Sequence, residues 1–139
     1  MLINEKVYAN KKIAEALSIP TGSPLIHVCR LRYANDEPMC IESAYLIYEK
    51  CPTVLEHDFS KISLRLFLEN EYNIFWKRAY QRIYAIKANS RLADYLNIID
   101  GDPLIYIERV SYNQNDEPGE YLQSYYRGDR FYLTAELEA

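Results

Sequence analysis

The sequence lacks the marks of several large classes of protein. No apolar run approaches the roughly 20 residues that a membrane span requires, and no basic segment followed by an apolar one opens the chain. The chain contains no Gly-rich phosphate-binding loop, no helix-turn-helix pattern, no nucleophile elbow and no low-complexity stretch. We therefore expect a soluble, cytoplasmic protein. Its length, with 49% hydrophobic and 26% charged residues, suits a single domain over residues 1–139.

Residues that bind metals or form disulfides are also scarce. The three cysteines, Cys29, Cys40 and Cys51, are odd in number and lack any Cys-x-x-Cys spacing, so we expect buried thiols in a reducing compartment. The two histidines, His27 and His57, lie far apart and predict no zinc site. The sequence thus predicts neither a metal nor a cofactor, and it shows no credible acid–base constellation of an enzyme.

Positive charge is in deficit, with 16 Lys and Arg against 20 Asp and Glu and a net charge of −4. A chain that grips nucleic acid phosphates usually presents a basic patch on a basic domain. Residues 73–88 do interleave aromatic and basic side chains, but their plain alternation is typical of a half-solvated strand. If this protein contacts DNA, we expect another domain to make the contact.

The chain repeats itself once. The segment Ala14–Ile26 returns as Ala93–Ile105 at a shift of 79 (93 minus 14). After one inserted residue the shift becomes 80, and Asn35–Pro38 recurs as Asn115–Pro118. The insertion predicts a bulge or a longer loop at Asn113–Gln114, because a slip of one residue would turn one strand over. The residues that recur include Arg30 and Tyr33, as Arg109 and Tyr112, and Tyr45, as Tyr125.

Each copy is expected to form a short helix, a glycine turn, a strand, a polar turn and a returning strand. Neither such a helix nor a lone hairpin is stable alone in water, so the two copies must share a sheet. The sequence therefore predicts an α+β fold, with a largely antiparallel sheet made from two pseudo-repeated helix–hairpin halves and helices packed around it. The expected strands are Pro24–Tyr33, Met39–Tyr48, Asn73–Ala88, Leu104–Tyr112 and Gly119–Tyr126, with Phe131–Leu137 as a final strand or tail.

Three helices are expected. The first follows Asn10, a plausible N-cap, and ends at Pro20–Gly22. The second is an amphipathic helix over residues 64–71 that begins near Ser60 or Ser63. The third, Arg91–Asn97, follows a cap at Asn89–Ser90. Residues 49–58 are expected to form a connecting loop with at most one helical turn.

A group of polar residues in the first half suggests an anion site. Arg30 and Arg32 are two residues apart on a strand, so they point the same way, and Glu42 lies on the returning strand. Ser63 opens a helix, and a helix N-terminus attracts anions. The residues alone leave a plainer alternative open, in which the arginines form cross-strand ion pairs with Glu42 on a solvated face and Ser63 is only a cap.

The two Gly-x-Pro hairpins, together with the run from Tyr125 to Arg130 (YYRGDR), resemble a known family. The chain is similar over residues 7–137 to the UTRA domain, the C-terminal effector-binding half of GntR-type transcription regulators of the HutC subfamily. This resemblance implies a chorismate lyase-like fold with a ligand pocket between sheet and helices. It also implies a homodimer, and a small anionic effector, commonly a sugar phosphate. Operator DNA would be bound only by a winged-helix domain outside this chain.

The resemblance also implies which residues contact the effector. Carried over position by position, these are Arg30, Arg32, Glu42, Ser63 and Tyr125. Two departures from the family pattern complete the candidate site: Arg65 adds a cation near the expected phosphate, and Tyr84 stands where many relatives carry an acidic residue. Two other functions stay open here: an enzyme on the same fold, and a dimerisation domain without a ligand. Convergence of Arg30, Arg32 and Ser63 on one cavity would favour a sensor.

Overall fold

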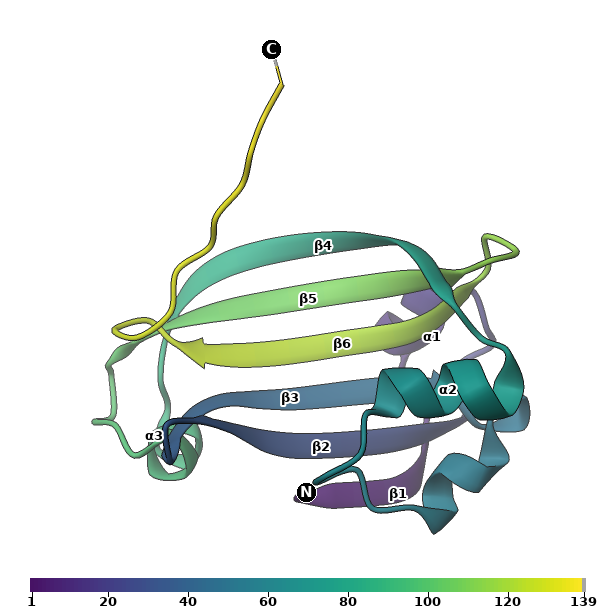
Figure 1. Ribbon diagram of the computed structural model, residues 1–139, viewed down its shortest axis with the longest axis horizontal. Coiled ribbons are helices and arrows are strands. Elements are labelled where there is room, and N and C mark those ends of the chain that lie inside the picture. The colour runs from purple at the N-terminus through teal and green to yellow at the C-terminus, as the bar shows by residue number, and fades with distance from the viewer. Residues whose placement is uncertain (139) are drawn as a thin grey trace.

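A computed structural model describes residues 1–138, which form one six-stranded antiparallel sheet in the order β1-β2-β3-β6-β5-β4 (Figure 1). The expected α+β class and antiparallel sheet are confirmed. The strands are β1 (Ile3–Tyr8), β2 (Pro24–Ala34), β3 (Glu37–Ile47), β4 (Trp76–Lys87), β5 (Pro103–Asn113) and β6 (Pro118–Arg127).

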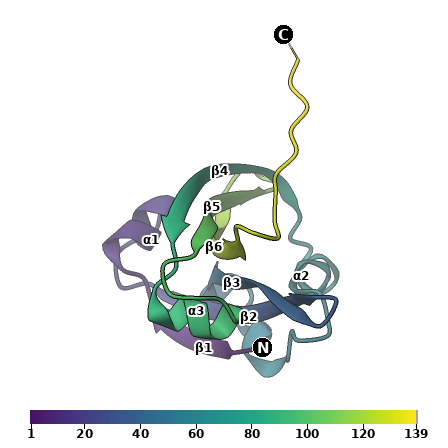
Figure 2. The same ribbon diagram turned by 90° about the vertical axis from the view of Figure 1, so that its left-hand side faces the viewer.

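Helices cover both faces of the sheet. They are α1 (Lys11–Leu17), α2 (Leu64–Tyr72) and α3 (Ser90–Leu96), with two short 3-10 helices, η1 (Tyr48–Lys50) and η2 (Pro52–Glu56). Figure 2 shows α2 on one side of the sheet and α1 and α3 on the other. The neighbours Leu25 and Ile26 show the same division, because Leu25 packs with α1 whereas Ile26 packs with α2 and η2. None of the helices in residues 1–138 is long and apolar enough to cross a membrane.

The sequence repeat is a structural repeat. Each half runs strand, helix, strand, strand, and the strand order of the sheet reads as one half followed by the other in reverse. Gly22 and Gly101 hold equivalent turns with φ of 88° and 94°, a conformation that favours glycine, and each donates its N–H at 2.8 Å to an alanine carbonyl that precedes the helix. Ser43 and Gln123, related by the shift of 80, face each other across β3 and β6. A pseudo-two-fold axis therefore passes between these two central strands.

The predicted helix N-caps are confirmed. Asn10, Ser63 and Asn89 each accept a hydrogen bond from the backbone N–H three residues later, at 2.9, 3.2 and 2.9 Å. The first helix ends earlier than expected, at Leu17, because Ser18 takes up a left-handed conformation with φ of 55°. Pro20 lies in the turn that follows.

Two other segments differ from the expectation. Strand β1 was not predicted, since residues 7–10 were expected only to lead into the helix. Residues 48–56 contain two 3-10 helices rather than at most one helical turn. Beyond Arg127 the chain forms the expected turn, and of the two alternatives for the residues that follow, a strand or a tail, the structure has the extended tail.

The inserted residue lies where a longer loop was expected. The first hairpin closes from Ala34 to Glu37, whereas the second closes from Tyr112 to Pro118. Both hairpins carry a register shift at the equivalent tyrosine, Tyr33 and Tyr112. The extra residue is therefore absorbed in the loop, and the faces of the two hairpins stay equivalent.

Candidate functional site

A cavity of about 970 Å³ opens on the α2 side of the sheet. Its floor comes from both halves, through side chains of β2, β3, β5 and β6. Residues 59–65, which lead into α2, form one wall, and Trp76–Ala79 of β4 form another. The cavity therefore lies over the region where the two halves meet.

The first half contributes an ion-paired triad to this cavity. Cross-strand register places Glu42 directly opposite Arg30. One carboxylate oxygen lies 3.1 Å from Nη2 of Arg30, and the other lies 3.2 Å from Nη1 of Arg32. The side chains of Arg30 and Glu42 are 17% and 11% exposed, whereas that of Arg32 is 59% exposed. Arg32 is thus the arginine that reaches furthest towards solvent, while Arg30 is fixed at the base.

The N-terminus of α2 forms part of the same cavity. Ser63 caps this helix through its side-chain oxygen, which accepts the Leu66 N–H at 3.2 Å. Arg65 lines the cavity as well, is 72% exposed, and pairs with Glu69 one turn later at 3.2 Å. The amide groups of a first helical turn lack partners within the helix, so this end carries a partial positive charge. The structure therefore brings together five of the seven predicted residues, Arg30, Arg32, Glu42, Ser63 and Arg65.

Tyr84 and Tyr125 lie elsewhere. They stack with Tyr106 in a ladder on the opposite face of the sheet, with centroid distances of 5.6 Å for Tyr84–Tyr106 and 4.6 Å for Tyr106–Tyr125. Tyr125 packs there against the core beneath α3, and Tyr84 donates a hydrogen bond to Glu108 at 3.2 Å. These two tyrosines do not share a site with the arginines.

Glu108 is the polar centre of that opposite face. Its carboxylate accepts hydrogen bonds from Tyr121 at 2.7 Å and from Lys12 of α1 at 2.6 Å. Burial acts to raise the pKa of Glu108, but the hydrogen bonds from Lys12, Tyr121 and Tyr106 outweigh it and lower the pKa to about 2. The carboxylate is therefore ionised at neutral pH and holds α1 to the sheet.

Sequence reasoning missed Arg109, which lines the cavity from β5. Arg109 is the repeat equivalent of Arg30, so the constant shift of 79 was the signal that could have found it. Its cross-strand neighbour is Leu122, not a carboxylate. Its Nε donates to Gln81 at 2.9 Å, and it forms no ion pair within residues 1–138.

The lining carries more positive than negative charge. Its two carboxylates are Glu42 and Glu120. Burial, and then the nearby Glu42 carboxylate, raise the pKa of Glu120 from 4.5 to about 7, although a hydrogen bond from Ser111 at 3.3 Å opposes the shift. The seven basic side chains of the lining are Arg30, Arg32, Lys61, Arg65, Lys77, Arg78 and Arg109. The cavity can accept an anionic group, and its carboxylates can accept hydrogen bonds from hydroxyl or amino groups.

The described part of the chain brings together no group of three or more His, Cys, Asp or Glu side chains that could hold a metal ion. All three cysteines are free and buried. Burial, with a smaller contribution from a nearby glutamate, raises the pKa of the Cys40 and Cys51 thiols to about 12. Both side chains are therefore neutral thiols in the core.

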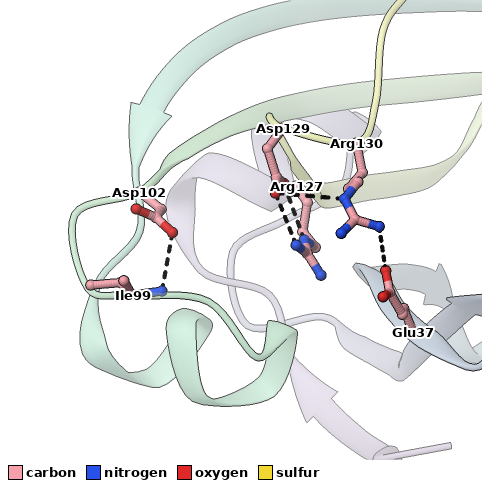
Figure 3. Close-up of polar contacts among 6 residues, drawn as sticks. All are labelled: Glu37, Ile99, Asp102, Arg127, Asp129 and Arg130. Carbon is pink, nitrogen blue, oxygen red and sulfur yellow. Dashed lines mark hydrogen bonds and ion pairs between the residues drawn. The ribbon is translucent and has the colours of Figure 1, made fainter.

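The YYRGDR run comprises the end of β6 and the turn that follows it, and none of its residues lines the cavity. Figure 3 shows the polar contacts of this turn. Arg127 donates two hydrogen bonds to Asp129, at 3.1 and 2.9 Å. Arg130 pairs with Glu37 at 2.5 Å, which ties the end of β6 to the turn between β2 and β3. Gly128 is required here, because a Cβ atom would lie 2.7 Å from the Pro103 carbonyl oxygen.

Comparisons with known proteins agree with this architecture. A family model for the UTRA domain matches residues 1–132. The HTH-type transcriptional repressor NagR of Bacillus subtilis is 32% identical over 123 residues, covering 88% of this chain and 50% of that protein. A probable fructoselysine utilization operon transcriptional repressor of Escherichia coli O157:H7 is 29% identical over 142 residues, covering 94% of this chain and 56% of that protein. The chain thus spans about half the length of these curated relatives.

Solved structures share the fold. The effector domain of PhnF from Mycobacterium smegmatis has a TM-score of 0.92 and 25% identity, with 99% of this chain and 85% of that chain covered. The ligand-binding domain of a putative GntR-family regulator from Bordetella bronchiseptica has a TM-score of 0.90 and 25% identity, covering 99% of this chain and 87% of that one.

Proposed function

The chain belongs to the UTRA domain family, and we propose that it is the ligand-sensing C-terminal domain of a GntR-type transcription regulator of the HutC subfamily. The observation that carries this proposal is the convergence of Arg30, Arg32 and Ser63 on one cavity. A dimerisation domain without a ligand has no need of such a basic hollow. The relatives bear the names of transcriptional regulators and not of enzymes, which supports a non-enzymatic role.

The chemistry of the cavity favours a small anionic metabolite, and a sugar phosphate best. Guanidinium groups and a helix N-terminus suit phosphate oxygens. Glu42 and Glu120 suit the hydroxyl or amino groups of the rest of the ligand. The name of one relative, a probable fructoselysine utilization operon transcriptional repressor, associates that protein with the use of a sugar derivative.

The ion-paired triad of Arg30, Glu42 and Arg32 can couple ligand binding to a change in conformation. An incoming phosphate competes with Glu42 for both guanidinium groups, so binding alters the contacts between β2 and β3. A ligand that binds one conformation better than another shifts the population towards it. In the proposed regulator, which would be a homodimer, this shift changes the affinity for operator DNA of a separate winged-helix domain outside this chain.

A thermal-shift screen tests the ligand class. Hexose phosphates should raise the melting temperature of the chain, since a ligand that binds only the folded state stabilises it, while the unphosphorylated sugars should not. With a ligand in hand, Arg30→Ala or Arg32→Ala should weaken binding by about 1 to 3 kcal/mol in calorimetry, as expected for a charge-assisted hydrogen bond.

Arg91→Ala serves as the matched control, because Arg91 is exposed on α3 and is remote from the cavity lining. Unchanged affinity in the Arg30 and Arg32 variants, with the fold intact by circular dichroism, would exclude these residues from the site. Turnover of any phosphate ester in the screen would instead favour an enzyme.

A further inference from the structure

The basic side chains that line the cavity form two groups on opposite sides of its floor. Arg30 and Arg32 lie on β2, whereas Arg109 lies on β5, and β3 and β6 run between these strands (Figure 1). Neighbouring strands are about 4.8 Å apart, so the three intervals separate the two groups by roughly 14 Å along the sheet backbone. Arg30 pairs with Glu42 of β3, and Arg109 donates to Gln81 of β4, so these contacts do not draw the two side chains together. The floor therefore offers two distinct places for an anion.

Arg109 is held on one side and free on the other. Its Nε lies 2.9 Å from the side-chain oxygen of Gln81, and the residue is half-buried. Within residues 1–138 its two Nη groups have no hydrogen-bond partner, and its cross-strand neighbour on β6 is Leu122 rather than a carboxylate. The planar fork of a guanidinium group binds phosphate or carboxylate oxygens in pairs. Arg109 thus presents a fixed and unused anion-binding group to the cavity.

Lys77 supplies a second free charge on the same side. It lines the cavity from β4, is exposed, and forms no ion pair among the described residues. Its neighbour Arg78 is already engaged, because Nε of Arg78 lies 2.6 Å from Asp116 and Cζ lies 3.9 Å from the centre of the Tyr112 ring. The uncompensated charge on this side of the cavity is therefore that of Arg109 and Lys77.

The space between the two groups is polar and large. Glu120 of β6 lies there, accepts a hydrogen bond from Ser111 at 3.3 Å, and forms no ion pair with Arg109 in the described chain. Its oxygens can also accept hydrogen bonds from hydroxyl groups. The cavity volume of about 970 Å³ lies at the upper end of the range of about 300 to 1,000 Å³ for ligand pockets. A ligand with a single phosphate on Arg30 and Arg32 would leave the side of Arg109 to water.

We propose that the ligand of this cavity carries two anionic groups at opposite ends of a hydroxylated frame, and that Arg109 and Lys77 bind the second one. This inference rests on the proposed function, and it narrows the ligand class from a sugar phosphate to one with a second phosphate or a carboxylate. The first anionic group lies at Arg30, Arg32 and the N-terminus of α2. Hydroxyl groups of the frame lie over Glu120, between the two ends.

Three compounds with a six-carbon frame test the second anion subsite in calorimetry. Glucose 6-phosphate carries one anionic group, 6-phosphogluconate adds a carboxylate at carbon 1, and glucose 1,6-bisphosphate adds a phosphate there. At least one of the compounds with two anionic groups should bind about 10- to 100-fold more tightly than glucose 6-phosphate, as one further charge-assisted contact predicts. The tighter of the two identifies the second group as a carboxylate or a phosphate.

Arg109→Ala should abolish this preference. It should weaken binding of glucose 6-phosphate to a smaller extent, because Arg109 then meets only a hydroxyl group of that compound. Arg78→Ala is the matched control, since Arg78 lines the same wall but is occupied by Asp116, and this variant should keep the preference. Circular dichroism checks that both variants are folded.

Equal affinity of the parent chain for all three compounds, or a preference that survives in Arg109→Ala, would overturn the second subsite. An equal loss of preference in Arg78→Ala and Arg109→Ala would also overturn it, because the total charge of the wall would then be responsible. In each of these cases, binding of glucose 6-phosphate to the parent chain leaves the proposed sensor intact. A parent chain that binds none of the three compounds would contradict the proposed ligand class, and this inference with it.

Discussion

The two halves of the domain share the same backbone arrangement, but equivalent arginines in the two halves, Arg30 and Arg109, have different charged neighbours. Arg30 in the first half lies opposite Glu42 and is neutralised by it. Arg109, its equivalent in the second half, lies opposite Leu122 and keeps its charge without a paired carboxylate among residues 1–138. The repeated backbone therefore forms the frame of the cavity, whereas the residues that differ between the two copies determine its chemistry.

The largest effect is expected where the halves are most alike. Leu17 and Leu96 are equivalent helix residues with exposures of 2% and 0%. Leu17→Ala and Leu96→Ala should each lower the free energy of unfolding by about 2 to 5 kcal/mol, because each leaves a cavity in the core. Urea denaturation measures both.

The exposed Leu66→Ala in α2 serves as a control and should change the free energy of unfolding little, since Leu66 is 55% exposed. A loss confined to one of the two core variants would mean that the halves do not contribute equally to the core.

A smaller effect is expected at Glu120, whose counterpart in the first half is the thiol of Cys40. The folded pKa of Glu120 is raised to about 7 from 4.5, so the folded state binds more protons between these values and stability falls as pH rises through that range. Glu120→Gln should remove this fall and stabilise the ligand-free protein at pH 8 by up to about 3 kcal/mol.

Melting temperatures of the parent and the Glu120→Gln variant, measured from pH 4 to pH 8, test this directly. The two proteins should agree at pH 4, where the carboxyl group is protonated in both the folded and unfolded states. Parallel curves over the whole range would show that the environment of Glu120 does not disfavour its charge.

The smallest effect is expected on ligand binding when Arg109 or Arg30 is replaced. Arg109→Ala should weaken binding of a hexose phosphate by about 1 to 2 kcal/mol, because one charge-assisted contact is lost. It should leave the unfolding free energy nearly unchanged, since Arg109 is not part of an ion pair in the described chain. Arg30→Ala should lower both quantities, because it also removes a partner of the buried Glu42. Calorimetry and urea denaturation of both variants separate the two roles.

Most of the fold could be predicted because the repeat is explicit in the sequence. The caps, the hairpins and the longer second loop all follow from it. β1 could not be found in this way, because its six residues include Asn, Glu and Lys, which are depleted in strands, and it is stabilised by long-range contacts, through pairing with β2 and through hydrogen bonds from Asn4 to residues 54 and 57.

The site was only partly predictable from the sequence, because successive side chains of a strand point to opposite faces of the sheet and the predicted residues do not all lie on one face. Tyr125 is the repeat equivalent of Tyr45, and Tyr45 lies an odd number of residues from Glu42, so the two tyrosines share the face opposite the arginines. The repeat also makes Arg109 the equivalent of Arg30, and on that basis Arg109 could have been included in the predicted site. The wall from residue 59 to Ser63 could not be foreseen, because it depends on how η2 and α2 pack on the sheet.

The helix α2 has no equivalent in the second half, where β6 is followed by the extended tail. A compound seated near the pseudo-two-fold axis meets Arg30 on one side and Arg109 on the other, so the sheet alone offers two orientations that differ by a half-turn. Ser63 and Arg65 stand on one side only, and they make those orientations unequal. The segment inserted between the two copies thereby makes the two ends of a nearly symmetric cavity chemically different, and for the proposed ligand we expect a single orientation and one bound molecule per chain.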